Sequence, residues 1–149
     1  MWNLKSVLSF SPNIEELGDH YFGRSNLTDV VEDYWDMDRV LHLGASMSMI
    51  SMFGAGIASG APKLPVWVFM GDGAFVMNSG TLMIERDLNL PNLRHFLVSN
   101  RVYNATGGVR LPNIERNDYA AMARAMGIER LNFIDSMKDL KAKFDSVVN

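Results

Sequence analysis

The stretch PVWVFMGDGA, residues 65–74, joins the most apolar run of the sequence to a Gly-Asp-Gly turn. Residues 65–70 are apolar throughout, which is typical of a strand buried on both faces of a parallel sheet. The glycines and the aspartate that follow favour a tight turn at the end of that strand. Because ligands of parallel α/β sheets bind where loops leave the carboxyl ends of strands, this turn is the first candidate for a functional site.

Strands and helices alternate on both sides of this stretch. The hydrophobic pattern predicts further strands over residues 39–43, 93–98 and 130–134, and helices over residues 11–18, 26–35, 46–61, 79–88, 117–127 and 136–147. Ser136 and Asp139 approximate a capping box for the last helix. We therefore expect one α/β domain over residues 1–149, with a doubly wound parallel sheet, helices on both faces and a flavodoxin-like or Rossmann-like three-layer architecture.

The composition excludes several classes of protein. Of the 149 residues, 48% are hydrophobic and 21% are charged, so a disordered chain is excluded. The net charge of -3 and the lack of a Lys/Arg run argue against binding to nucleic acid or to an anionic membrane. The absence of cysteine rules out disulfides, thiolate zinc sites and cysteine nucleophiles.

Residues 40–62 contain no Asp, Glu, Lys or Arg, a length that is compatible with a membrane span. Glycines and serines interrupt this segment and lower its hydrophobicity, so we expect a helix buried in protein and no membrane span. The first residues of the chain lack the apolar core of a secretory signal. We therefore expect a cytoplasmic protein.

The glycines of GAGIASG, residues 54–60, followed by Asp72, also suggest a dinucleotide-binding turn. Only residues 61–64 separate this segment from the next strand, which is too short for the crossover helix of a βαβ unit. Close packing of a helix against the sheet is the better explanation of these glycines.

A second polar residue, Asn100, follows the next apolar strand, 28 positions after Asp72. One crossover returns the chain to a neighbouring parallel strand, so we expect Asp72 and Asn100 to converge on one ion, with a loop carbonyl as a further ligand. Mg²⁺ takes few protein oxygens, and the backbone N–H groups of such a turn bind anions, so the pair suits a diphosphate–Mg²⁺ complex. As a competing interpretation, Asn100 is a turn former and residues 107–108 form a hairpin bend.

This combination resembles the thiamine diphosphate motif, and in particular the diphosphate-binding domain of sulfopyruvate and phosphonopyruvate decarboxylases. The matching segments are ASMS at residues 45–48, GDGA at residues 71–74 and SNRVYNATGGV at residues 99–109. The departures from the family pattern are Ala45 and Ser48 in place of glycines, Arg101 where a glycine is usual, and Val109 in place of a glutamine.

The resemblance implies a role for each matching residue. The Asp72 and Asn100 side chains and the Val102 carbonyl would bind Mg²⁺. The N–H groups of Gly73 and Ala74 would face the diphosphate. Further cofactor contacts would come from Ser46, Gly71, Asn100, Val102, Tyr103 and Asn104.

The methionine of the family's first segment falls on Met47. The resemblance implies that Met47 supports the V shape of thiamine diphosphate, with its N–H meeting the aminopyrimidine ring while the Ala45 carbonyl receives the 4′-amino group. The neighbouring methionines are expected to be adaptable core packing.

The resemblance further implies decarboxylation of a small 2-oxo acid, for which thiamine diphosphate is the electron sink. In that superfamily the activating Glu lies on a pyrimidine-binding domain, and 149 residues have room for only one of the two domains. We therefore expect a separately encoded partner subunit, a hetero-oligomer of paired domains and no activity without the partner. A carboligase or acyl-transferring enzyme of the acetolactate-synthase type, and a non-catalytic cofactor-binding or regulatory subunit, stay open as alternatives.

The three histidines show no metal-ligand spacing. His42 and His95 fall in predicted strands, where we expect them to be structural. His20 falls in a segment predicted to be irregular, and it is the histidine that we expect to be able to reach an active site.

Overall fold

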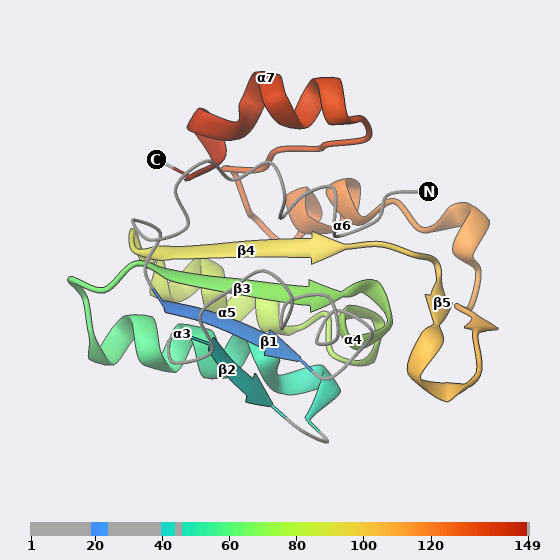
Figure 1. Ribbon diagram of the computed structural model, residues 1–149, viewed down its shortest axis with the longest axis horizontal. Helices are drawn as coiled ribbons and strands as arrows, with labels where there is room; N and C mark the ends of the chain where they lie inside the picture. The colour runs from blue at the N-terminus through green and yellow to red at the C-terminus, as the bar shows by residue number, and fades with distance from the viewer. Residues whose placement is uncertain (1–18, 24–39, 44–45, 149) are drawn as a thin grey trace.

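The computed structural model describes residues 19–23, 40–43 and 46–148 (Figure 1). The strands are β1 (Asp19–Gly23), β2 (Val40–Leu43), β3 (Val66–Gly71), β4 (Leu93–Val98), β5 (Val102–Tyr103) and β6 (Val109–Arg110). The α-helices are α3 (Ile50–Gly60), α4 (Asp72–Met77), α5 (Thr81–Leu88), α6 (Tyr119–Ala125) and α7 (Met137–Val148), and the 3₁₀ turns are η3 (Met47–Met49), η4 (Asn104–Thr106) and η5 (Ile114–Arg116). Ala45 and the helices predicted over residues 11–18 and 26–35 lie outside the described residues.

The main sheet is parallel and has the strand order β2-β1-β3-β4. β3 pairs with β1 on one side and with β4 on the other. The last register pairs of β3 and β4 are Met70 with Leu97 and Gly71 with Val98, so both strands end at the same edge of the sheet. This arrangement confirms the predicted α/β class with a parallel sheet.

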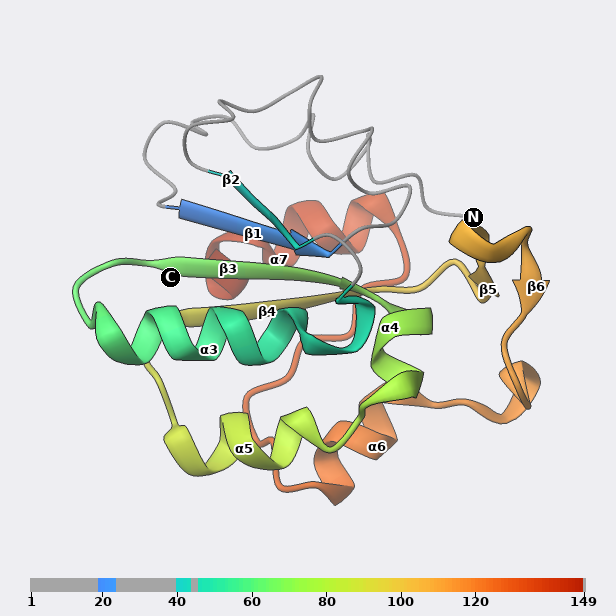
Figure 2. The same cartoon turned by 90° about the horizontal axis from the view of Figure 1, so that it is seen from below.

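One face of the sheet is covered by α3, α5 and α6 (Figure 2). The core on this face includes Ile50 of α3, Val68 and Met70 of β3, and Phe75 of α4. A Cβ atom at Gly54 would overlap Cγ2 of Val68, so only glycine lets α3 lie this close to β3. Gly54 therefore serves helix packing, as predicted, whereas a Cβ atom at Gly56 or Gly60 would meet open space, so the packing explanation holds for Gly54 and not for those two glycines. None of the described helices is both long and apolar enough to cross a membrane.

The aromatic side chains of β3 and β4 lie together. The Phe69 and Phe96 rings stack with centroids 4.7 Å apart and planes 9° apart, and the Trp67 ring lies 5.2 Å from Phe96. Trp67 and Phe69 are buried, and residues 66–70 are buried along their whole length, as predicted for a central strand. α7 lies on the β4 side of the sheet (Figure 1).

Two predicted elements are wrong. α4 begins at Asp72, directly after β3, where a turn was expected, because Ala74 and Phe75 pack into the core and draw the chain into a helix at once. Residues 130–134 are irregular instead of a strand. Their apolar run is short and pairs with no strand of the described residues, and the Phe133 carbonyl accepts a hydrogen bond from Lys143 Nζ at 2.8 Å instead.

The helix boundaries depend on capping side chains. Asp118, and not the predicted Asn117, caps α6, because its Oδ1 accepts the Ala121 N–H at 2.9 Å. Ser136 Oγ accepts the Asp139 N–H at 3.1 Å, so the predicted start of the last helix is confirmed.

His20 lies in a strand, not in an irregular segment. It belongs to β1 and pairs in register with Val40 of β2 and Trp67 of β3. Residues 19–23 form a strand because they pair with β2 and β3, which are distant in sequence. A local sequence pattern does not reveal such pairing, so the prediction of an irregular segment was wrong.

Candidate functional site at the carboxyl edge of the sheet

Asp72 is the first residue of α4 and is 1% exposed. Its Oδ1 accepts the Gly73 N–H at 3.0 Å. Its Oδ2 accepts two further hydrogen bonds, from Ser99 Oγ at 2.6 Å and from the Arg101 N–H at 2.9 Å. The structure therefore brings the segment after β3 and the segment after β4 together around one carboxylate.

Asn100 and Val102 lie in the same segment after β4. Asn100 Oδ1 accepts the Val102 N–H at 3.1 Å, which closes a local turn. Between them, Arg101 adopts the left-handed backbone conformation, with φ +67°. Glycine adopts this conformation without a steric penalty. Arg101 therefore has a backbone conformation that favours glycine.

Tyr103 and Gly73 fit against each other. A Cβ atom at Gly73 would lie 2.8 Å from Cδ1 of Tyr103, which is closer than real Cβ contacts allow. The glycine therefore lets the β5 tyrosine cover the first turn of α4. The Gly73 N–H itself donates to Asp72, so in this structure it fixes the carboxylate, which is not the role that the resemblance implies for it.

Tyr119 is a residue of this site that the sequence did not suggest. Its hydroxyl is buried beside the side chains of Asp72 and Asn117 but makes no well-formed hydrogen bond to a described residue, and its ring packs edge-on against Phe75 at 5.7 Å. Burial raises the pKa of the hydroxyl above its ordinary value, and the nearby Asp72 charge raises it further. Tyr119 is therefore a neutral hydrogen-bond donor at physiological pH, close to the Asp72 carboxylate.

The chemistry of these groups fits a divalent cation. Buried charges in proteins are paired or coordinate metals, and no Lys or Arg side chain of the described residues forms an ion pair with Asp72. No cluster of three or more His, Asp or Glu side chains that could hold a metal occurs in the described part of the chain. One carboxylate, one amide and a carbonyl suit Mg²⁺, which takes its other ligands from phosphate or water.

The pyrimidine end of the site was predicted at residues 45–48, of which the structure describes 46–48. Residues 46–49 are here called the Met47 segment. Ser46 precedes η3, and its carbonyl accepts the Met49 N–H at 3.0 Å. Met47 is half-buried and packs against the hydrophobic cluster that contains Ala74 and Phe75 of α4. The Met47 segment thus shares a core with the helix that begins at Asp72.

Two further residues of the sequence motif lie in the β5–β6 hairpin, and His95 lies in β4. Asn104 and Val109 are exposed in the β5–β6 hairpin, where Gly107 and Gly108 have φ +90° and +76°. This hairpin agrees with the competing interpretation of residues 107–108, and it leaves the convergence of Asp72 and residues 99–102 intact. His95 Nδ1 lies 3.0 Å from Glu85 Oε1 of α5, in a nearly buried structural pair.

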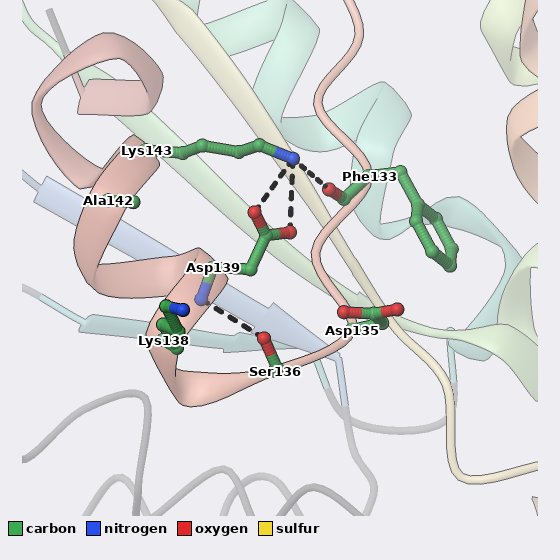
Figure 3. A pocket seen from close by; sticks show the side chains of 7 residues that line it. All are labelled: Phe133, Asp135, Ser136, Lys138, Asp139, Ala142 and Lys143. Carbon is green, nitrogen blue, oxygen red and sulfur yellow. Dashed lines mark hydrogen bonds and ion pairs between the residues drawn. The ribbon is translucent and has the colours of Figure 1, made fainter.

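A surface hollow at the start of α7 is distinct from this site (Figure 3). All its lining residues come from one segment, residues 133–143. Lys143 Nζ lies 2.9 Å from Asp139 Oδ1 and donates to the Phe133 carbonyl. Because these groups satisfy one another, the hollow is a weaker candidate than the buried Asp72 carboxylate.

Comparison of the sequence with known proteins gives one family. The chain matches "Thiamine pyrophosphate enzyme, C-terminal TPP binding domain" over residues 26–149. It is 31% identical over 105 residues to a phosphonopyruvate decarboxylase of Streptomyces hygroscopicus. The aligned region covers 70% of this chain and 26% of that protein. It is 25% identical over 114 residues to the sulfopyruvate decarboxylase subunit beta of Methanocaldococcus jannaschii. The aligned region covers 76% of this chain and 60% of that subunit.

The fold is shared with benzoylformate decarboxylase from Polynucleobacter necessarius, with a TM-score of 0.75 at 16% identity over 97% of this chain and 30% of that one. The class that the fold defines is a parallel α/β domain, whose carboxyl edge carries the polar groups around Asp72. The chain belongs to the thiamine pyrophosphate enzyme family and corresponds to its C-terminal TPP-binding domain. The resemblance seen in the sequence motifs is thereby confirmed.

Proposed function

We propose that this chain is the diphosphate-binding subunit of a cytoplasmic, thiamine diphosphate- and Mg²⁺-dependent enzyme that decarboxylates a small 2-oxo acid. The observation that carries the proposal is the buried Asp72 carboxylate, which holds the segment after β4 and has no cationic partner among the described residues. The names of the relatives, phosphonopyruvate decarboxylase and sulfopyruvate decarboxylase subunit beta, support the type of reaction.

In this proposal the residues at the sheet edge hold the metal and the diphosphate. The Asp72 and Asn100 side chains and the Val102 carbonyl bind Mg²⁺, and Tyr119 donates its hydroxyl hydrogen to a water or phosphate oxygen at the metal. The remaining diphosphate contacts come from Gly71, Ala74, Tyr103 and Asn104, while the Gly73 N–H holds the Asp72 carboxylate. Thiamine diphosphate, when bound, supplies the electron sink for loss of CO₂ from a 2-oxo acid.

Met47 and Ser46 act at the other end of the cofactor. The half-buried Met47 supports the bend between the two rings, and packing of its side chain against the core keeps this support rigid. The Met47 N–H and the Ala45 carbonyl orient the aminopyrimidine. The chain's own residues therefore bind and orient the cofactor at both ends.

We further propose that the activating Glu comes from a separately encoded pyrimidine-domain subunit, in a hetero-oligomer that is inactive without it. The name of the sulfopyruvate decarboxylase relative, a subunit beta, supports a divided enzyme. In the phosphonopyruvate decarboxylase relative, the matched region is only about a quarter of a longer protein.

The test is calorimetry with thiamine diphosphate and Mg²⁺ on the chain together with any copurifying subunit, repeated for Asp72→Ala. The proposal expects binding that depends on Mg²⁺ and that Asp72→Ala abolishes, whereas unchanged affinity in the variant rejects this metal site. The exposed Asp87, paired with Arg86, provides the control Asp87→Ala. Product analysis with pyruvate, alone and with an aldehyde acceptor, then separates decarboxylation from carboligation, and an absence of turnover with every 2-oxo acid identifies a regulatory subunit.

A further inference from the structure

Asn78, directly after α4, reaches back to the Met47 segment. Its Nδ2 donates to the Ser48 carbonyl at 3.3 Å and lies 3.9 Å from the Met49 sulfur. Asn78 is half-buried, and the Ser48 carbonyl that it binds belongs to the residue after Met47. A single side-chain amide thus joins α4 to the proposed support of the pyrimidine.

The backbone of Asn78 is itself fixed. Its N–H donates to the Phe75 carbonyl at 3.1 Å, in the last turn of α4. Its carbonyl accepts the Thr81 N–H at 3.4 Å and the Thr81 Oγ1 hydroxyl at 3.1 Å, and Thr81 is 1% exposed. The amide therefore extends from a point held by the end of α4 and the start of α5.

α4 links the two ends of the proposed cofactor site. Asp72 is its first residue and Asn78 follows its last, Met77. A helix of six residues is a short, stiff spacer of about 9 Å at 1.5 Å per residue. A ligand with a diphosphate at one end and an aminopyrimidine at the other is held in one shape only if its two supports keep a fixed spacing.

We propose that Asn78 is a positioning residue that sets the Met47 segment against the Asp72 end of the site. It acts on the aminopyrimidine end of thiamine diphosphate and leaves the diphosphate end unaffected. The inference rests on the proposed function, because it assigns the two ends of that cofactor to Met47 and Asp72.

The chain offers a matched control in Asn92. Its Nδ2 also donates to backbone carbonyls, those of Ala58, Ala61 and Leu64, at 3.0, 3.1 and 2.8 Å. These carbonyls belong to the end of α3 and the segment after it, whereas Asn78 contacts the turn before α3. Asn78→Asp and Asn92→Asp remove the same kind of donor with almost no change in side-chain volume.

The experiment titrates the full chain, with any copurifying subunit, with thiamine diphosphate and separately with inorganic pyrophosphate, both in Mg²⁺. We expect Asn78→Asp and Asn78→Ala to weaken thiamine diphosphate binding by roughly three- to tenfold, the range for loss of one hydrogen bond. Pyrophosphate binding should change by less than about twofold, because the Asp72 end is intact. Asn92→Asp should lower the melting temperature and leave the ratio of the two affinities unchanged.

The outcomes separate the two proposals. If wild type binds thiamine diphosphate through Asp72 but Asn78→Asp and Asn78→Ala keep the ratio of affinities, or lose both ligands equally, the positioning role is wrong and the proposed function stands. The positioning role is also wrong if Asn92→Asp changes the ratio as much. If wild type binds neither ligand, or Asp72→Ala binds both as wild type does, the proposed function fails first.

Discussion

The Arg101 backbone N–H lies 2.9 Å from Asp72 Oδ2, and Arg101 makes this bond from a left-handed conformation with φ +67°. The bond joins the segment after β4 to the helix after β3, so the conformation at residue 101 determines where Asn100 and Val102 stand relative to Asp72. The Arg101 side chain is exposed and is not required for this bond. The backbone conformation, and not the identity of the side chain, is what the site needs at this position.

Arg101→Gly should therefore be tolerated or stabilising. A left-handed non-glycine residue costs about 1–2 kcal/mol, and the greater entropy of glycine in the unfolded chain offsets about 0.4–1 kcal/mol of the gain. We expect the free energy of unfolding in urea to rise by between zero and about 1.6 kcal/mol. The control Arg116→Gly, in the 3₁₀ turn η5, should lower it. A loss of stability in Arg101→Gly as large as in the control would contradict this account.

Gly73→Ala should lower stability. Alanine is the better helix former by about 1 kcal/mol, but its Cβ would press on the Tyr103 ring, and overpacking costs about 1–3 kcal/mol. We expect a net loss in urea unfolding that Tyr103→Ala partly restores in the double variant. Gly56→Ala, with open space around its Cβ in α3, is the control and should raise stability. Equal behaviour of the two glycines would show that the contact with Tyr103 is unimportant.

Tyr119→Phe should have opposite effects on stability and on metal binding. The substitution removes a buried hydroxyl that makes no well-formed hydrogen bond to a described residue, so the metal-free protein should gain up to about 1 kcal/mol in the free energy of unfolding. The same change should weaken Mg²⁺-dependent binding of pyrophosphate about tenfold or more, as for other groups that surround a metal site. Thermal unfolding in EDTA and calorimetry in Mg²⁺ measure the two effects. A variant that loses stability and keeps its affinity would reverse both expectations.

Asp72→Asn should lower stability as well as metal affinity. Donors approach both carboxylate oxygens, so the new NH₂ group faces at least one donor in either orientation of the amide. Leaving such a buried donor unpaired costs about 1–3 kcal/mol. We expect this loss in urea unfolding and an Mg²⁺ affinity reduced by at least about a hundredfold. The exposed Asp87→Asn should change neither quantity, and a similar response of both variants would count against a metal at Asp72.

The sequence predicted the strands that are apolar throughout and missed the features that depend on tertiary contacts. β4 has its predicted bounds, and β3 differs by one residue at each end, because a continuous apolar run has few ways to be buried. Residues 130–134 also contain apolar side chains, but this segment pairs with no strand of the described residues. Glycine and aspartate indicated a turn at Asp72, where burial of Ala74 and Phe75 favours a helix.

The candidate site was predictable where motif spacing matched topology. Asp72 and Asn100 each follow one of two neighbouring parallel strands, so their proximity follows from the strand order. Tyr119 begins a helix formed far along the chain, and no local pattern distinguishes it from other tyrosines. The sequence around Asn78 likewise indicates only a turn, and the structure alone reveals that its amide donates to the Ser48 carbonyl.

The place of β1 between β2 and β3 has a consequence for the order of folding. β3 and β4 are close in sequence and form a compact unit with α4 and α5, whereas β1 must close a longer loop to reach β3. Shorter loops close at a smaller entropic cost and more quickly. During refolding, the edge that carries Asp72 and Asn100 therefore assembles within the β3–β4 unit before the first strand docks, and in hydrogen exchange the β3–β4 ladder should be protected earlier than the β1–β3 ladder.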